Sequence, residues 1–382
     1  MGAENSQDEH FHMESHAALL HQTSATLDPD EAKGEPSRCL DAIVVPTIRP
    51  WSIAPAIALA SEIGCALVVL CTTAEQAGQA RQQCQVVNGD LLVTHVTPSV
   101  EDEHLDFLTS EHPENDIEPS CHADIARKRN VGLLLARLSG WRAVMFLDDD
   151  IRGMTAAAIT EAASLTARFQ AAGFCVDPYP DNSVVCHAHR LAGGAQDVFP
   201  GGSALVIDVA SAVTLFPPIY NEDWLFLFDA AQRRSVAVAG TLSQLEYQPF
   251  AHPRRAASEE FGDVIAEGLY RLLHEGGSVT DATHAYWRST LQRRFALIDH
   301  IAERLLLGQP AAPGTECALM SLAAARKRLA SITELACVSF VRAWRADVAA
   351  WQDKLAHLAA VGDLTTAAKH LDLPALDGGV NQ

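Results

Sequence analysis

The chain has 382 residues, of which 48% are hydrophobic, so it has enough apolar material for a sizeable core and wholesale disorder is excluded. This length favours one large domain with an appendage, or two domains. Asp and Glu number 48 against 28 Lys and Arg, and the net charge of −20 repels nucleic-acid backbones and anionic lipid alike. We therefore expect no nucleic-acid partner.

No apolar run in the sequence approaches the roughly 20 residues that a membrane helix needs. The first residues are acidic, whereas a signal peptide begins with basic residues. We therefore expect a cytoplasmic protein without a membrane span. The nine cysteines are scattered without a CxxC pair, which favours reduced, mostly buried thiols over a disulfide or zinc framework.

Residues 1–37 are polar and contain little that can pack, so we expect a disordered polar tail. Residues 38–255 alternate short apolar runs with helical stretches, which is typical of a sheet with crossover helices. The expected strands cover 42–46, 65–72, 91–97, 143–147, 183–191, 203–209 and 235–247. The expected helices lie within 47–64, 76–85, 123–140, 155–171 and 222–233. This order predicts an α/β fold with a doubly wound, nucleotide-binding sheet flanked by helices.

Two further regions stand outside this alternation. Residues 98–120 are rich in Asp and Glu and contain no Lys or Arg, so we expect a solvated surface loop, with a lid over a cleft as the alternative. Residues 256–382 have a helical pattern only. Their clearest apolar stripe consists of Phe340, Trp344, Val348, Trp351 and Leu355. Such a stripe is typical of a core, and it is equally suited to burial against a second copy in a homo-oligomer.

Asp148, Asp149 and Asp150 directly follow the apolar strand at 143–147. Three adjacent carboxylates repel one another, and the buried strand before them partly excludes water, so we expect a positive partner. A hard divalent cation, Mn²⁺ or Mg²⁺, meets this need. Because side chains alternate along an extended chain, Asp148 and Asp150 point one way and Asp149 the other. The alternatives are a helix N-cap cluster and a plain surface turn.

The segment RNVGLLLARLSGWRAVMFLDDDI (129–151) contains an RNxG pattern, a helix, a small-residue turn and an apolar strand that ends in a DxD. FPGGSALVIDV (199–209) and NEDWLFLF (221–228) follow it along the chain. In this order the three segments resemble GT-A fold glycosyltransferases, family-2-like ones in particular, across residues 41–255. The resemblance implies a GT-A nucleotide-sugar-binding and catalytic domain over 38–255, followed by a helical C-terminal region that has no match in the family.

The resemblance implies that the DxD holds Mn²⁺ or Mg²⁺ against the two phosphates of a nucleoside-diphosphate sugar. Asp150 is the expected direct ligand, and Asp148 contacts the ribose or assists through water. His252 lies where related enzymes often have a third ligand. His187 and His189 are rivals for that role, although alternating histidines in a strand are usually half-exposed strand residues.

The resemblance also makes Asp223, in the NED segment, the expected general base of an inverting displacement, with Glu222 as the alternative. A carboxylate near a diphosphate has a raised pKa, which suits a base. The competing interpretation is an ordinary helix start, because acids are favoured at the positive end of the helix dipole. A retaining GT-A transferase stays open, since it shares the DxD.

The expected nucleotide-sugar-binding residues are Thr47, Arg49, Arg127, Arg129, Asp148, Asp149, Gly201 and Gly202. The pair at 47 and 49 follows the first strand, where the family's first loop meets the nucleoside. The two arginines at 127 and 129 lie near a helix start, and their clustering favours an anion such as pyrophosphate. The glycines let the backbone approach donor or acceptor, or simply make a turn.

The sequence departs from the family at CTTAEQ (71–76), where family-2 enzymes have an acidic, serine-containing stretch, so the choice between UDP and GDP donors stays open. Three rival functions remain. A DxD phosphatase has Thr or Val where Arg152 stands, a sugar-nucleotide pyrophosphorylase needs a glycine-rich loop that PTIRP (46–50) lacks, and a non-catalytic nucleotide-sugar-binding protein keeps the acids without turnover. We predict a metal-dependent, hexosyltransferase-like GT-A enzyme with a nucleoside-diphosphate sugar donor and a soluble acceptor.

Overall fold

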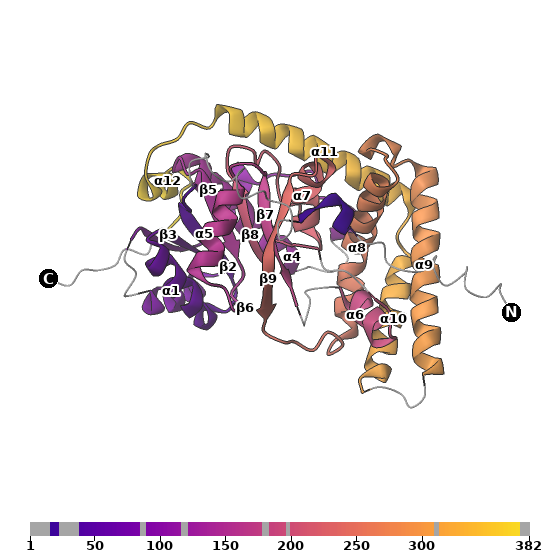
Figure 1. Ribbon diagram of the computed structural model, residues 1–382. Helices are drawn as coiled ribbons and strands as arrows, with labels where there is room; N and C mark the ends of the chain where they lie inside the picture. Colours follow the sequence, from indigo (N-terminus) through magenta and orange to yellow (C-terminus); the bar gives the residue numbers. More distant parts are fainter. Residues whose placement is uncertain are drawn as a thin grey trace.

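The computed structural model describes the chain at residues 16–22, 38–84, 89–115, 121–177, 183–195, 199–308 and 313–374. A twisted sheet with helices on both faces forms one part of the molecule, and a group of long helices stands beside it (Figure 1). Helix α11 (Glu334–His357) runs from the helical group across the sheet part, so the two parts are joined along one side.

The sheet mixes parallel and antiparallel strands. In chain order they are β1 (His21–Gln22), β2 (Ala42–Thr47), β3 (Ala66–Cys71), β4 (Leu91–His95), β5 (Ala143–Leu147), β6 (Ile151–Arg152), β7 (Ala171–Val176), β8 (Ala204–Asp208) and β9 (Val236–Gln244). Their order across the sheet is β4-β3-β2-β5-β8-β7-β9-β1, and β6 pairs with β9 off this path. Strands β2 to β5 run parallel, whereas β8 is antiparallel to both β5 and β7.

Both faces of the sheet are buried. Successive side chains of a strand point to opposite faces, and each face packs in a core of its own. In β2, Val44 belongs to one core and Ile43 and Val45 belong to the other. The helices that flank the sheet are α1 (Ala54–Ile63), α2 (Ala74–Gln83), α4 (Cys121–Leu138), α5 (Ala156–Leu165) and α7 (Glu222–Gln232). Residues of α1, α2 and α5 pack in the core of Ile43, and residues of α4 and α7 pack in the core of Val44. The expected sheet with helices on both faces is present.

The described part of the C-terminal region is helical. Its helices are α8 (Pro253–His274), α9 (His284–Leu307), α10 (Thr315–Leu329), α11 and α12 (Leu364–His370). The apolar stripe from Phe340 to Leu355 is buried in α11 and belongs to the core of Val44. After α11 the chain returns to the sheet part, where the Val361 N–H donates to the Leu138 carbonyl over 2.7 Å. The stripe therefore packs within this chain.

One expected strand is wrong. Residues 183–191 form helix α6 (Val184–Leu191), and Ser183 starts it by accepting the Cys186 N–H over 3.3 Å. The alternating histidines of this segment imitate a strand pattern, but the helix is covered by α8, α9 and α10. The strand of this region is β7, where the sequence predicts only the end of a helix.

Two segments expected to lack regular structure have it in part. Residues Pro98–His104 of the expected loop form helix α3, because Thr97 caps it and proline occupies its first position. Of the expected tail, residues 16–22 pack against the protein: His16 is 5% exposed and β1 pairs with β9. The rest of the tail, 1–15 and 23–37, lies outside the described residues.

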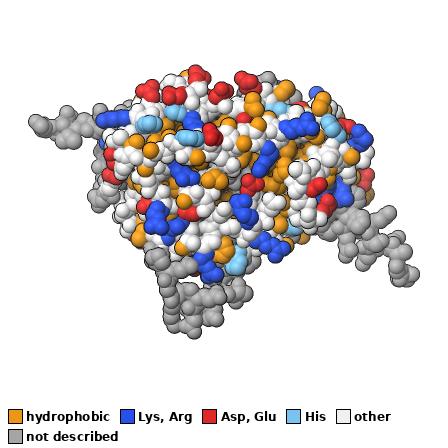
Figure 2. Space-filling view, turned by 90° about the horizontal axis from the view of Figure 1, so that it is seen from above, with side chains coloured by type: hydrophobic (Ala, Val, Ile, Leu, Met, Phe, Trp, Pro, Cys, Tyr) orange, Lys and Arg blue, Asp and Glu red, His pale blue; other side chains and the backbone are white. Residues whose placement is uncertain are grey.

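The cysteines whose side chains the structure describes are all free thiols, as expected. Within the described ranges, no helix combines the length and the apolar character needed to cross a bilayer. On the face seen from above, described basic and acidic side chains are interspersed with hydrophobic ones (Figure 2). This face therefore lacks the continuous basic band typical of a nucleic-acid-binding surface.

Candidate functional site

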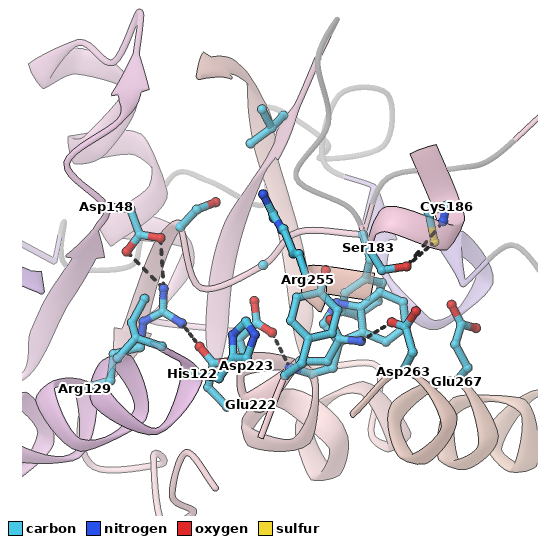
Figure 3. A pocket seen from close by; sticks show the side chains of 18 of the residues that line it. His122, Arg129, Asp148, Ser183, Cys186, Glu222, Asp223, Arg255, Asp263 and Glu267 are labelled. Atoms are coloured by element: carbon cyan, nitrogen blue, oxygen red, sulfur yellow. Dashed lines mark hydrogen bonds and ion pairs between the residues drawn. The ribbon is translucent and has the colours of Figure 1, made fainter. Parts of the chain in front are cut away.

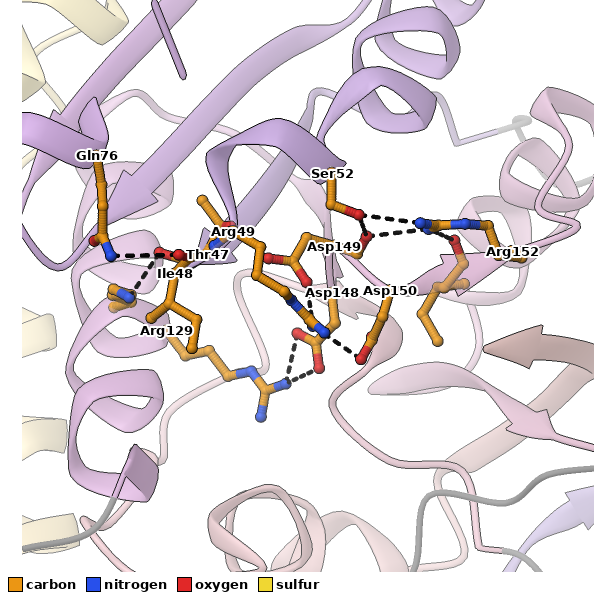
Figure 4. A network of polar contacts seen from close by, with 12 residues as sticks. Thr47, Ile48, Arg49, Ser52, Gln76, Arg129, Asp148, Asp149, Asp150 and Arg152 are labelled. Atoms are coloured by element: carbon orange, nitrogen blue, oxygen red, sulfur yellow. Dashed lines mark hydrogen bonds and ion pairs between the residues drawn. The ribbon is translucent and has the colours of Figure 1, made fainter. Parts of the chain in front are cut away.

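The candidate site lies where the strand order reverses. Strands β3 and β4 lie on one side of β2. Strand β5 lies on the other side of β2, followed by β8, β7, β9 and β1. In open α/β sheets, ligands bind in the crevice outside the carboxyl ends of strands at such a point. Thr47 ends β2 and Asp148–Asp150 follow β5, so two of the predicted segments meet at this edge (Figure 4).

Asp149 joins the ends of β2 and β5. Its carboxylate accepts hydrogen bonds from the Thr47 hydroxyl and from the Arg49 guanidinium. The same Arg49 Nη2 lies 2.9 Å from Asp150 Oδ2. The Asp149 side chain is 3% exposed, whereas those of Asp148 and Asp150 are 17% and 23% exposed. The expected pairing of Asp148 with Asp150 on one side is not observed, because Asp149 and Asp150 lie in a turn and both reach Arg49, whereas Asp148 reaches Arg129.

Arg129 is a buried cation between two acidic segments. Its Nη2 lies 3.0 and 3.1 Å from the two Asp148 carboxylate oxygens, and its Nη1 donates to Glu222. Burial alone lowers the pKa of Arg129, but Asp148, Glu222 and Asp223 hold this pKa above its ordinary value. Because Arg49 and Arg129 both contact the aspartate trio, the trio does not depend on a metal ion as its positive partner.

Gly201 and Gly202 let two charged side chains approach the main chain. A Cβ at Gly202 would lie 2.5 Å from Arg129 Nη1, and a Cβ at Gly201 would lie 2.7 Å from Asp223 Oδ2. Both separations are shorter than non-bonded contacts allow, so any larger residue would displace the arginine or the carboxylate. The Gly202 N–H also donates to Asp223 Oδ2 over 2.5 Å. The two glycines therefore position groups on both sides of the site.

Asp223 and Glu222 begin α7 but have different surroundings. Asp223 lines a cavity, and its Oδ1 accepts the Trp224 N–H over 2.9 Å while its Oδ2 accepts the Gly202 N–H. Glu222 is buried and bonded to Arg129. Burial raises the pKa of Glu222 to about 8, although the charge of Arg129 opposes this shift. Two backbone N–H groups therefore hold Asp223, whereas Arg129 holds Glu222.

A cavity of about 170 Å³ connects the aspartates to the helical region (Figure 3). Arg129 and Asp148 lie at one end of it, and Asp223 lies further along toward the other end. The other residues of its lining that matter below are His122, Ser183, Phe199, Tyr220, Trp224, Arg255, Asp263 and Glu267. The sequence analysis assigned a role to none of them: Asp263 and Glu267 lie in the helical region without a family match, and the others lie within 38–255 at positions outside the motif residues. The available signal was the group of acids in α8, which is otherwise a buried helix.

The three basic residues at the start of α4 diverge. Arg127 Nη1 pairs with Glu101 at 2.7 Å, and this arginine lines a separate groove rather than the cavity. The structure therefore does not place Arg127 at the diphosphate site. Lys128, which the sequence analysis passed over, is buried, and its Nζ lies 2.9 Å from the Thr47 carbonyl oxygen. It fixes the turn after β2, and Arg129 alone of the three reaches the aspartates.

Arg152 and Ser52 brace the turn that carries the aspartates. Arg152 Nη1 donates to the Asp149 carbonyl over 3.0 Å, and its Nη2 lies 3.0 Å from Ser52 Oγ. The Ser52 hydroxyl donates to the same carbonyl over 2.7 Å. Arg152, which stands where a DxD phosphatase has Thr or Val, therefore has a structural role at this turn.

The candidate histidine ligands do not join the aspartates. His252 is exposed at the start of α8. His187 Nε2 lies 2.8 Å from the Tyr247 hydroxyl, and His189 Nε2 lies 3.3 Å from the Ala195 carbonyl oxygen. Among the described residues, no group of three or more His, Cys, Asp or Glu could hold a metal ion. The structure therefore does not support a histidine as third ligand.

The acids that the sequence predicts as cation ligands here are Asp148 and Asp150, and their carboxylates are bonded to Arg129 and Arg49, respectively. Hard oxygen ligands suit Mg²⁺ and Mn²⁺. Mg²⁺ is usually bound through one or two carboxylates, with substrate phosphates and water in the other positions. The residues present therefore fit a cation that binds together with a phosphate-bearing ligand, and they do not form a cage that would hold it alone.

No family model matches the sequence, and no curated protein matches it. Among solved structures, the chain is similar to a mannosyltransferase from Pyrobaculum calidifontis in complex with GDP-Man and Mn²⁺. The similarity covers 90% of this chain and 92% of that one, at 13% sequence identity and a TM-score of 0.42. A likeness at this level carries no argument about activity, so the function is inferred from the site itself.

Proposed function

We propose that the protein is a metal-dependent, GT-A type glycosyltransferase, which moves a sugar from a nucleoside-diphosphate sugar to a soluble acceptor. The observation that carries the proposal is that Asp148, Arg129 and Asp223 face one cavity at the switch point of the sheet. A nucleotide-binding edge, a cation-binding pair of acids and a carboxylate from a different element are the parts that this transfer needs.

The donor binds along the carboxyl ends of β2 and β5, with its nucleoside near Thr47 and Arg49 and its diphosphate near Asp148 and Asp150. The carboxylates of the DDD and NED segments outnumber Arg49 and Arg129, so a diphosphate needs a further positive charge here. A divalent cation supplies this charge and stabilises the leaving nucleoside diphosphate.

Asp223 acts as the general base. The acceptor oxygen attacks the anomeric carbon, the bond from that carbon to the phosphate oxygen breaks with its electron pair, and the acceptor proton passes to Asp223. Two backbone N–H groups hold the Asp223 carboxylate, so its orientation is set before the substrates bind. Attack opposite the leaving group inverts the anomeric configuration. Glu222, which is engaged by Arg129, positions the arginine instead.

Thermal stabilisation tests the donor site. The protein is heated with UDP, GDP, CDP and their sugars, with and without Mn²⁺, and one nucleotide type is expected to stabilise it only with the metal. A ligand at 100 times its Kd adds about 2.7 kcal/mol. Asp150→Ala is expected to abolish this shift, whereas Asp353→Ala, at a position that is 80% exposed on α11, is expected to keep it. No shift with any nucleotide would contradict the proposal.

Turnover tests the base. Asp223→Asn is expected to lower kcat by about 10²–10⁴-fold with nucleotide binding unchanged. The matched control is Asp229→Asn on the same helix, where the carboxylate pairs with Arg345 at 3.0 Å outside the cavity. Full turnover by Asp223→Asn would rule out this base, and a product with retained configuration would rule out inversion. Nucleotide binding without turnover in the wild type would indicate a non-catalytic binder, and phosphomonoester hydrolysis a phosphatase.

A further inference from the structure

The helical region supplies the inner end of the cavity, beyond Asp223. Ser183 lies at the start of α6, and Arg255, Asp263 and Glu267 come from α8 (Figure 3). In Figure 3 these acids lie away from the end at Asp148, with Asp223 between the two ends. The donor edge is built by the sheet, so the inner end is a separate part of the same cavity.

Acidic groups outnumber basic groups around this inner end. Arg255 Nε lies 2.6 Å from Glu259 Oε1, so its charge is matched inside the protein. Arg294 is shared between Glu260 at 2.8 Å and Asp263 at 2.7 Å, so one cation serves two carboxylates. The ion pairs at the inner end therefore contain more carboxyl groups than cations, although burial raises the pKa of Glu259 to about 7 and also raises the pKa of Glu260 and Asp263, which reduces their negative charge.

Two further groups belong to this end. Glu267 is 24% exposed, and its carboxylate lies 3.2 Å from His16 Nε2. The imidazole that lines the cavity, His122, adds no positive charge at neutral pH, because burial lowers its pKa to about 4. An anionic ligand would therefore meet carboxylates in a partly water-excluded space, where repulsion is strong.

Aromatic rings form part of the same end. Trp224 lies with its ring centroid 5.1 Å from Phe199 and 4.9 Å from Tyr270, so its plane is fixed by packing. Trp224, Tyr220 and Phe199 all line the cavity. Apolar ring faces beside a few polar groups suit a small molecule that presents both C–H bonds and hydroxyls.

We propose that the inner end of the cavity is the acceptor subsite, and that it takes a hydroxyl-bearing sugar or polyol unit without negative charge and rejects carboxylate- and phosphate-bearing acceptors. The inference rests on the proposed function, because it places the acceptor hydroxyl at Asp223. The inner end is only part of a cavity of about 170 Å³, so it suits a small acceptor unit.

Paired acceptors that share a skeleton but differ in charge test the inference. With the donor found by thermal shift and Mn²⁺, a panel containing glucose, glucuronate and glucose 6-phosphate, mannose and mannose 6-phosphate, and glycerol and glycerate is incubated, and products are detected by mass spectrometry. A neutral member is expected to have a kcat/KM at least 10-fold above that of its anionic partner. The inference would be overturned if an anionic member had the same kcat/KM as its neutral partner. It would also be overturned if none of the neutral members were glycosylated.

Variants at Glu267 test the charge directly. Glu267→Gln is expected to raise the kcat/KM of the anionic members relative to the neutral ones at least 3-fold. The matched control, Glu275→Gln, changes a carboxylate that is 50% exposed at the end of the same helix and is expected to leave this ratio unchanged. A loss of stability alone would not move the ratio, and equal ratios in the two variants would overturn the inference. Hydrolysis of the donor by water, measured without acceptor, distinguishes failure of this inference from failure of the proposed function. If neither hydrolysis nor nucleotide binding is observed, the proposed function is contradicted. If the donor is hydrolysed but the acceptor preference is wrong, only this inference is contradicted.

Discussion

Replacement of Arg129 tests whether this buried cation holds the two halves of the site together. Its side chain is 3% exposed and lies between Asp148 and Glu222, so Arg129→Met leaves the Asp148 carboxylate without its counter-charge and the buried Glu222 carboxyl without its hydrogen-bond donor. Removing one partner of a buried ion pair costs about 3–5 kcal/mol. At about 2–4 °C per kcal/mol, the Tm falls by roughly 6–20 °C. Methionine is apolar and also unbranched, so much of the packing is kept and the loss reports the missing charge.

Melting curves at pH 7 followed by circular dichroism measure this loss. Asp148→Asn added to Arg129→Met removes the carboxylate charge that loses its counter-charge, so the double variant is expected to regain about 1 kcal/mol or more. Arg326→Met, which breaks an exposed pair with Asp299, is the control and is expected to melt like the wild type. The reasoning is refuted if Arg129→Met melts like this control, or if the double variant is less stable than the single one.

Four further outcomes are expected. Gly202→Ala places a methyl group 2.5 Å from Arg129 Nη1 and is expected to lower the free energy of unfolding by about 1–3 kcal/mol in urea titrations; an unchanged midpoint contradicts this contact. The folded-state pKa of Glu222, about 8, lies above its ordinary 4.5, so its contribution to stability is present below pH 4.5 and is lost as the pH rises toward 8. Glu222→Gln is expected to remove this fall from the curve of stability against pH, and an equally steep curve contradicts the burial. His16→Ala removes a buried ring from the N-terminal segment, and hydrogen exchange of that segment is expected to quicken while the central strands stay protected. Asp150→Asn is expected to weaken Mn²⁺ binding in calorimetry mainly when nucleotide is present, and an equal loss without nucleotide argues against a shared site.

The central strands could be predicted from sequence because their own residues are mostly apolar and therefore indicate burial. Strands β2, β3, β5 and β8 are buried at every position and form short continuous apolar runs. β7 lacks this signal, since it begins with two alanines and Gly173. A Cβ at Gly173 would lie 2.7 Å from Pro200, so this glycine is required by a neighbour distant in the sequence. Its strand character comes from pairing with β8 and β9, which no local pattern reveals.

The acids and glycines of the site could be predicted, but their partners could not. Asp149 and Arg49 are 100 positions apart in the sequence, and only the parallel pairing of β2 and β5 brings them together. Arg127 and Arg129 are two residues apart on a helix, which turns them to different faces. The sequence does not tell which of the two faces the aspartates. The acids of α8 belong to the cavity through tertiary packing alone.

The charge distribution links the two proposals. Arg49 contacts two acids of the trio, and Arg129 is shared between Asp148 and an acid of the NED segment, so the aspartates are stable at the end of a buried strand before any ligand binds. Two cations do not balance all of these acids, and the surplus reaches the cavity at Asp148 and Asp223. A nucleoside diphosphate adds negative charge to this surplus, so it requires a cation to enter. A neutral acceptor adds none and requires no cation. The same excess of carboxylates therefore underlies both proposals, that the donor needs a metal ion and that the acceptor is selected by charge.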